Sequence, residues 1–255
     1  MIKTTNWQLE HPRHKQTNWT NGAFYAGVYA AWETTRSKKI YDAMMAVGND
    51  STQWQPGKRW FHADDIAISQ MYIDLYRQEK RPEMLKATID ALARFQKEPY
   101  PTSGKKDIIK WWWCDALFMA PPVLVKLGVV TNDNSYIEYN DKCFKECYEL
   151  LYNKKERLFA RDLDYVIKED GKGRKEANGK LIFWGRGNGW VMGGLARILK
   201  ELPSDYPQRN FYERLFKEMA ARIVSLQQAD GLWRASLLDP ESYPGGEVSG
   251  SGFLC

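Results

Sequence analysis

One acidic residue, Asp115, lies in the strongly apolar stretch KWWWCDALFMAPP, residues 110–122. It could cap the N-terminus of the apolar helix that the next residues predict, the commoner role of an aspartate before a helix. It could also be a catalytic acid, because dry surroundings raise the pKa of a carboxyl group and keep it protonated. Three consecutive tryptophans cannot all face one core, so at least one of them should line a rim or pocket.

A second polar cluster precedes another apolar segment, in QPGKRWFHADDIAIS, residues 55–69. Asp64 and Asp65 are the types of residue that cap a helix or occupy its first turn. His62 could orient a carboxylate or bond a substrate hydroxyl.

Gly185, Gly187 and Gly189 alternate with Arg186 and Asn188 in IFWGRGNGWVMGGLARIL, residues 182–199. The glycine spacing is not GxGxxG and no strand precedes it, so nucleotide binding is disfavoured. The glycines more simply allow close approach of neighbouring backbones. Arg186 is suited either to bidentate binding of a substrate carboxylate or to pairing with a structural acid.

Helical periodicity dominates the chain and predicts an all-α fold. Some segments are apolar almost all round and others carry one charged face, which predicts an inner and an outer layer of helices arranged as a ring of hairpins. In such a ring the three clusters share one end. The expected helices are 22–35, 64–78, 82–97, 135–153, 188–202 and 211–228.

The composition limits the number of domains and the kinds of partner and metal site that can be expected. The 255 residues contain no linker-like segment, so a single domain over 1–255 is expected. The net charge of +5 favours anionic partners, but the chain has no basic stripe of the kind that binds nucleic acid. The four cysteines form no CxxC or His/Cys cluster, so no metal is expected, and Cys143 and Cys147 should be buried thiols.

The segment MIKTTNWQLE lacks the apolar core of a signal peptide, and no apolar run is long enough to span a bilayer. We therefore expect a cytoplasmic chain without membrane contacts, or a periplasmic one if an N-terminal segment has been removed.

Taken together, the motifs closely resemble glycoside hydrolase family 105, the unsaturated rhamnogalacturonyl hydrolases, and behind it the related unsaturated glucuronyl hydrolases of family 88. The resemblance covers almost the whole chain and keeps the motif order. It implies an (α/α)6 barrel of twelve helices, of which about nine or ten are expected here, without the last hairpins. The motifs are NWTNGAFYAG, HADDIAISQMYIDLYR, WWWCDALFMAPPVLVKLG, WGRGNGWVMGGLARIL and DPESYPGGEVSGSGF.

The resemblance also implies residue roles. Asp115 matches the general acid, and Asp64 stands where a second acidic position is expected. The implied substrate is a pectin-derived oligosaccharide that ends in a 4,5-unsaturated galacturonic or glucuronic acid, and no cofactor is implied. The substrate-binding candidates at matching motif positions are Trp113, Arg186 and Trp190. Further candidates are their neighbours Trp112, His62 and Asp65, and Arg161, which stands where this sequence differs from the family pattern.

That departure concerns the aglycone contact. Some family members carry a pocket histidine in the segment that reads RLFARDLDYV here, residues 157–166, where Arg161 and Asp162 stand instead. The preferred aglycone sugar is therefore open.

Two rival functions remain. The chain could be a catalytically silent glycan-binding or vestigial member, in which the same aromatic residues bind sugar without turnover. It could instead be another (α/α)6-barrel enzyme, such as a polysaccharide lyase or sugar epimerase. Such enzymes rely on a pocket histidine or tyrosine as base, and His62 is the one histidine outside the polar N-terminal segment.

Overall fold

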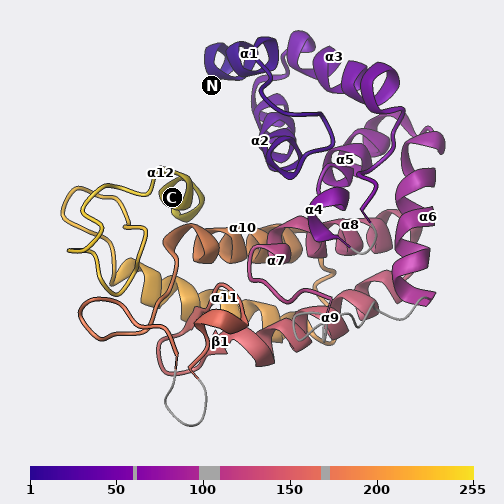
Figure 1. Ribbon diagram of the computed structural model, residues 1–255. Coiled ribbons are helices and arrows are strands. Elements are labelled where there is room, and N and C mark those ends of the chain that lie inside the picture. The colour runs from indigo at the N-terminus through magenta and orange to yellow at the C-terminus, as the bar shows by residue number, and fades with distance from the viewer. Residues whose placement is uncertain (60–61, 98–109, 168–172) are drawn as a thin grey trace. The chain divides into compact units, whose positions relative to one another are not determined.

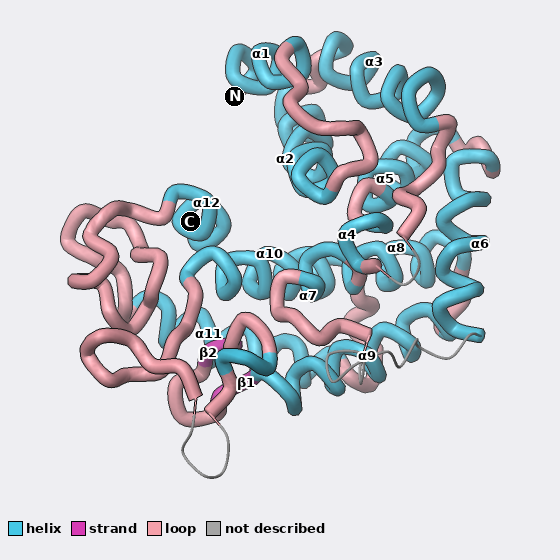
Figure 2. Tube along the Cα trace, viewed as in Figure 1, coloured by secondary structure: helices cyan, strands magenta, loops and turns pink. Residues whose placement is uncertain are grey.

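The computed structural model describes residues 1–59, 62–97, 110–167 and 173–255, and these residues are mostly helical (Figures 1 and 2). They form two compact units. The first unit comprises the described parts of Met1–Pro99 and Lys126–Tyr136, and the second comprises those of Tyr100–Val125 and Ile137–Cys255. Each unit is described by itself.

Among the described residues of the first unit up to 97, there are seven helices. Their bounds are α1 (Ile2–Glu10), α2 (Trp19–Thr35), α3 (Lys38–Ala46), the π-helix η1 (Val47–Thr52), α4 (Ala63–Ile66), α5 (Ser69–Glu79) and α6 (Glu83–Lys97). Helix α2 begins where the Asn18 side chain accepts a hydrogen bond from the Thr20 amide, 3.0 Å away. The core of this unit contains Tyr25, Ile40, Met44, Met71, Tyr72 and Met84.

Helices α8 (Pro121–Thr131) and α9 (Ser135–Leu151) have residues in both units. The other elements of the second unit are α7 (Ala116–Met119), the antiparallel strands β1 (Tyr152–Asn153) and β2 (Leu158–Phe159), the 3-10 helix η2 (Leu163–Tyr165), α10 (Gly185–Glu201), α11 (Arg209–Val224) and α12 (Val248–Leu254).

Helix α10 contacts α7, α11 and α12, and Figure 1 shows α7 beside it. Glycines make the close contacts possible. A Cβ atom on Gly194 would lie 2.3 Å from the Leu117 carbonyl oxygen, and one on Gly189 would lie 3.0 Å from the Gly250 Cα. The expectation that these glycines allow close backbone approach is confirmed.

The predicted helices are found, with shifted ends. The expected helix 64–78 is divided into α4 and α5, and residues 152–153 of the expected helix 135–153 belong to β1. Every residue from 65 to 75 is buried, so the hydrophobic pattern there carried no information about where the helix is interrupted.

A search of the described helices for a segment long and apolar enough to cross a membrane finds none.

Candidate active site

Asp115 stands immediately before α7 and is half-buried. Its backbone is already helical, with φ −66° and ψ −22°, and its side chain makes no capping hydrogen bond. Of the two roles that the sequence left open for Asp115, capping of this helix by the side chain is therefore not observed. A normal N-cap has an extended backbone and a side chain that accepts from the helix.

The backbone before Asp115 is held by an antiparallel contact. Trp113 forms an isolated β-bridge with Asp162, and the Cys114 amide donates to the Arg161 carbonyl oxygen at 2.9 Å. This contact places Arg161 and Asp162 beside the stretch that carries Asp115.

The three tryptophans have different surroundings. Trp111 and Trp113 are buried, whereas Trp112 is partly exposed. The rings of Trp112 and Trp113 meet edge to face, with centroids 4.7 Å apart. Trp112 thus supplies the partly exposed aromatic surface that the sequence predicted for one of the three.

The site borders buried thiols. Cys114, Cys143 and Cys147 are free and buried, as the sequence predicted for the last two. Burial raises the pKa of Cys114, Cys143 and Cys147. These thiols therefore stay protonated, which suits a packing role better than nucleophilic catalysis.

Arg186, in the first turn of α10, pairs with an acid. Its guanidinium lies 4.6 Å from the Trp184 ring centroid, and Nη1 lies 3.5 Å from Glu247 Oε1. Glu247 in turn accepts from the Gly250 amide and so caps α12. The Arg186 side chain is still 42% exposed. The structural pairing that the sequence left open is confirmed, and the carboxylate contact stays a prediction.

Trp190 packs between two phenylalanines. Its ring centroid lies 4.9 Å from that of Phe118 and 4.4 Å from that of Phe253, and the residue is only 6% exposed. Little of the ring can meet a ligand in this arrangement. Its predicted substrate contact remains untested.

Asn188 holds α10 to β2 and was missed by sequence reasoning. Its Oδ1 accepts from the Phe159 amide at 2.9 Å and its Nδ2 donates to the Phe159 carbonyl oxygen at 3.1 Å. An amide side chain within an apolar helix was the signal that could have indicated this role.

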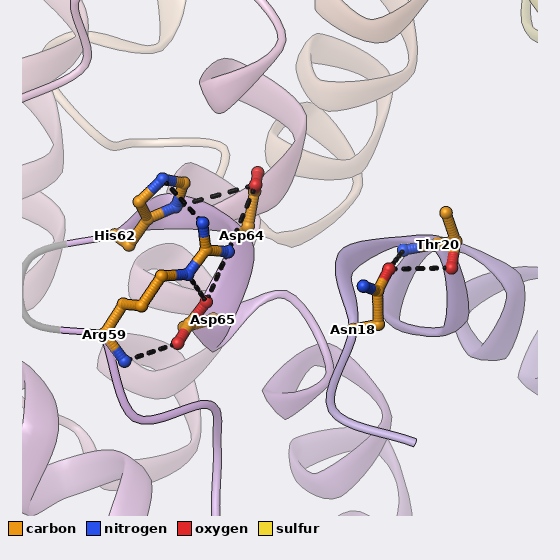
Figure 3. A network of polar contacts seen from close by, with 6 residues as sticks. All are labelled: Asn18, Thr20, Arg59, His62, Asp64 and Asp65. Atoms are coloured by element: carbon orange, nitrogen blue, oxygen red, sulfur yellow. Dashed lines mark hydrogen bonds and ion pairs between the residues drawn. The ribbon is translucent and has the colours of Figure 1, made fainter. Parts of the chain in front are cut away.

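The first unit contains a second polar cluster, drawn in Figure 3. Asp65 accepts from the Arg59 amide at 2.6 Å and from Arg59 Nε at 2.8 Å. A Cβ atom on Gly57 would lie 2.4 Å from the Asp65 Cγ, so only glycine allows this approach. Asp65 thus fixes the loop before α4.

His62 and Asp64 lie on the other side of the same guanidinium. Arg59 Nη1 lies 3.0 Å from His62 Nε2, and Arg59 Nη2 lies 3.4 Å from Asp64 Oδ2. Because a guanidinium can only donate, His62 Nε2 accepts and the proton is on Nδ1, which is 3.6 Å from Asp64 Oδ2. Asp64 is a first-turn acid of α4, as predicted.

Burial dominates the titration of this pair. Burial lowers the pKa of His62, and the positive charge of Arg59 lowers it further. Burial also raises the pKa of Asp64, although the charges of His62 and Arg59 oppose this shift. A neutral histidine beside a carboxyl group with a raised pKa is a pair suited to proton transfer.

The two clusters belong to different units. Asp115, Arg161 and Arg186 lie in the second unit, and His62 and Asp64 lie in the first. Their placement at one end of a barrel remains a prediction. Among the described residues, no group of three or more His, Cys, Asp or Glu side chains is placed to hold a metal ion.

Comparisons with known proteins show which family model and which proteins the chain is similar to. The model of the family described as Glycosyl Hydrolase Family 88 matches residues 1–255. The chain is 49% identical over 267 residues to an unsaturated 3S-rhamnoglycuronyl hydrolase from Formosa agariphila, a match that covers 99% of this chain and 70% of that protein.

Two solved structures are also similar. One is described as a polysaccharide lyase, with a TM-score of 0.89, 28% identity, and coverage of 98% of this chain and 72% of that one. The other is a family 88 glycosyl hydrolase from Bacteroides vulgatus, with a TM-score of 0.87, 26% identity, and coverage of 99% and 75%. The predicted fold class, the all-α (α/α)6 barrel type, is confirmed.

Proposed function

Because the chain belongs to glycosyl hydrolase family 88, we propose that it removes a 4,5-unsaturated uronic acid from the non-reducing end of an oligosaccharide. One observation carries the proposal. Asp115 is half-buried at a helix N-terminus that it does not cap, three residues after the partly exposed Trp112. Capping of α7 does not account for this carboxyl group, and proton donation is the role that we propose for it.

The proposed reaction hydrates the double bond. The Asp115 carboxyl group gives its proton to C4, and the positive charge that forms at C5 is shared with the ring oxygen. Water adds its oxygen to C5 and returns a proton to the carboxylate. The resulting hemiketal opens to a ketone at C5, and the hemiacetal left at C1 expels the aglycone as an alcohol. One water is consumed, and a single acid suffices, unlike the two carboxylates of ordinary glycosidases.

Other residues bind and orient the substrate. The half-exposed guanidinium of Arg186 is suited to bind the uronate carboxylate. Its ion pair with Glu247, 3.5 Å away, orients the guanidinium for this contact. Trp112 offers an apolar face for a sugar ring. Asp64, in the first unit, matches the second acidic position of the family, and we assign it an auxiliary role that its raised pKa favours, not the donation of the proton to C4.

The finer identity of the substrate is part of the proposal. The resemblance to family 105 favours a galacturonic acid linked to rhamnose from pectin, with glucuronic acid as the alternative. The name of the Formosa relative supports a rhamnose-containing glycuronide without deciding between the two acids. A panel of unsaturated galacturonyl- and glucuronyl-rhamnose would rank them by kcat/KM.

A lyase is the second candidate, because a similar structure is described as a polysaccharide lyase. The two reactions change the ultraviolet absorbance of the conjugated C4=C5 uronate in opposite directions. A hydrolase of this type consumes the double bond and lowers the absorbance, whereas a lyase creates it from an intact polyuronate and raises the absorbance.

The mechanism can be tested with a sulfur-linked analogue of the unsaturated disaccharide. Hydration does not need a protonated glycosidic oxygen, so the O- and S-linked compounds should lose absorbance at similar rates. Cleavage of the O-linked compound with an unreactive S-linked one would indicate direct glycoside hydrolysis. Binding of both compounds with no absorbance change would support the silent glycan-binding alternative.

A further inference from the structure

Gly187, in the first turn of α10, lies between two side chains of the second unit. A Cβ atom there would lie 2.7 Å from Trp184 Cε3 and 2.9 Å from Cys114 Sγ. We infer that Gly187 is a positioning residue, which sets the places of Arg186 and Asp115 through these two contacts. The inference rests on the proposed function and adds to it a residue that acts through its neighbours.

The indole of Trp184 joins Gly187 to Arg186. Its Cε3 atom packs where Gly187 has no side chain, and the guanidinium carbon of Arg186 lies 4.6 Å from the ring centroid. A cation is attracted to the face of an aromatic ring, so the position of the indole helps to fix that of the guanidinium. A methyl group at Gly187 would displace the indole and, with it, the group proposed to bind the uronate carboxylate.

The thiol of Cys114 joins Gly187 to Asp115. Cys114 is buried, and its amide donates to the Arg161 carbonyl oxygen at 2.9 Å. Its own carbonyl oxygen accepts from the Leu117 amide at 3.1 Å. The thiol has little room to turn away, because close-packed interiors leave few voids. A methyl group at Gly187 would therefore shift the backbone that continues directly into Asp115.

The first turn of α10 is also held on other sides. The Gly185 amide donates to the Ala235 carbonyl oxygen at 2.8 Å, and Trp184 forms a β-bridge with Ser236. Helix α12 approaches the same turn, since a Cβ atom on Gly250 would lie 3.0 Å from the Gly185 carbonyl oxygen. The turn therefore has little freedom to move away, and an added methyl group is expected to displace the thiol and the indole.

The test separates the two contacts by their effects on KM and kcat for unsaturated galacturonyl-rhamnose. Gly187→Ala should raise KM about tenfold, because Arg186 is displaced, and lower kcat about tenfold or more, because Asp115 is displaced. Removing the thiol as well, with Cys114→Ala in the same chain, should restore much of kcat. KM should stay high in this double variant, since the indole is still displaced.

Two single variants serve as controls. Gly252→Ala adds a methyl group to α12 of the same unit, where nothing lies within 4 Å, and should leave KM and kcat unchanged. Cys114→Ala alone measures what loss of the thiol does to kcat. Unchanged KM and kcat in Gly187→Ala would overturn the inference, and so would a Cys114→Ala substitution that restores both parameters together or neither.

Direct binding separates this inference from the proposed function. Calorimetry with the same disaccharide in chains that also carry Asp115→Asn requires no turnover. Gly187→Ala should weaken binding about tenfold, as for loss of a hydrogen bond to a charged group, and Gly252→Ala should not. This result supports the inference even if the unchanged chain hydrolyses nothing. Equal affinities in the two variants would overturn it whatever the hydrolytic activity.

Urea unfolding tests the contact between Gly187 and Cys114 without any ligand. The effects of Gly187→Ala and Cys114→Ala on the free energy of unfolding should not be additive, because the new methyl group occupies space beside the thiol. Additive effects would overturn the inference.

Discussion

Single side chains decide which chemistry this molecule can perform. Asp65 and Asp64 are adjacent, yet their contacts differ. Asp65 accepts hydrogen bonds from the amide and the guanidinium of Arg59. Asp64 Oδ2 lies 3.4 Å from Arg59 Nη2 and 3.6 Å from His62 Nδ1. The sequence could not tell the two acids apart. Their contacts assign Asp65 to loop structure and leave Asp64 as the candidate for proton chemistry.

The titration of His62 tests this assignment. Burial lowers the pKa of His62 below its ordinary 6.5, so the folded state prefers the neutral ring. Its contribution to stability therefore falls as pH drops through the unfolded pKa. For Asp64 the folded pKa is raised, so its contribution falls as pH rises above the ordinary 3.8.

Histidine NMR should therefore show a His62 midpoint below 6.5. Asp64→Asn should lower this midpoint further, because the carboxylate favours the imidazolium, and Arg59→Gln should raise it. A midpoint at or above 6.5, or one that neither variant moves, would contradict the described cluster.

The Arg186 guanidinium is expected to bind the uronate carboxylate. Arg186→Ala should raise KM about tenfold or more with a smaller change in kcat, as for loss of a hydrogen bond to a charged group. Steady-state kinetics on unsaturated galacturonyl-rhamnose measures this, with Arg214→Ala as control. An unchanged KM would leave Arg186 with its structural role alone, the pairing with Glu247.

At the scale of elements, α10 organises the second unit through its glycines. The sequence predicted the helix and the purpose of the glycines, because small residues at the start of an apolar helix admit close neighbours. It did not predict which neighbours. The contacts with α7 and α12 are long-range, and no local pattern specifies them.

Two glycine variants test this packing. Gly194→Ala should lower the free energy of unfolding by about 1–3 kcal/mol, because the new Cβ would lie 2.3 Å from the Leu117 carbonyl oxygen. Gly27→Ala is the matched helical control, since a Cβ there meets nothing within 4 Å. It should stabilise by about 0.4–1 kcal/mol.

Urea unfolding followed by circular dichroism gives both values. Equal effects of the two substitutions would show that α7 does not pack on α10 as described.

For the whole molecule, periodicity and motif order predicted the helical class and the family type, because buried faces and motif spacing are properties of the chain alone. The surroundings of particular residues could not be predicted from the sequence. Asp115 lacks the expected cap bond, Trp190 is enclosed by Phe118 and Phe253, and Asn188 clamps Phe159. The positions of Trp190 and Asn188 depend on partners distant in sequence, which neither propensity nor spacing identifies.

The central claim is that Asp115 supplies the proton that starts the reaction. The most direct measurement is the loss of ultraviolet absorbance of unsaturated galacturonyl-rhamnose on addition of the chain, of Asp115→Asn and of Asp205→Asn, an exposed aspartate in the turn before α11. We predict decay with the chain and with Asp205→Asn, and a loss of about 10² to 10⁴ in turnover with Asp115→Asn at unchanged circular dichroism. Decay that persists in Asp115→Asn would contradict the account.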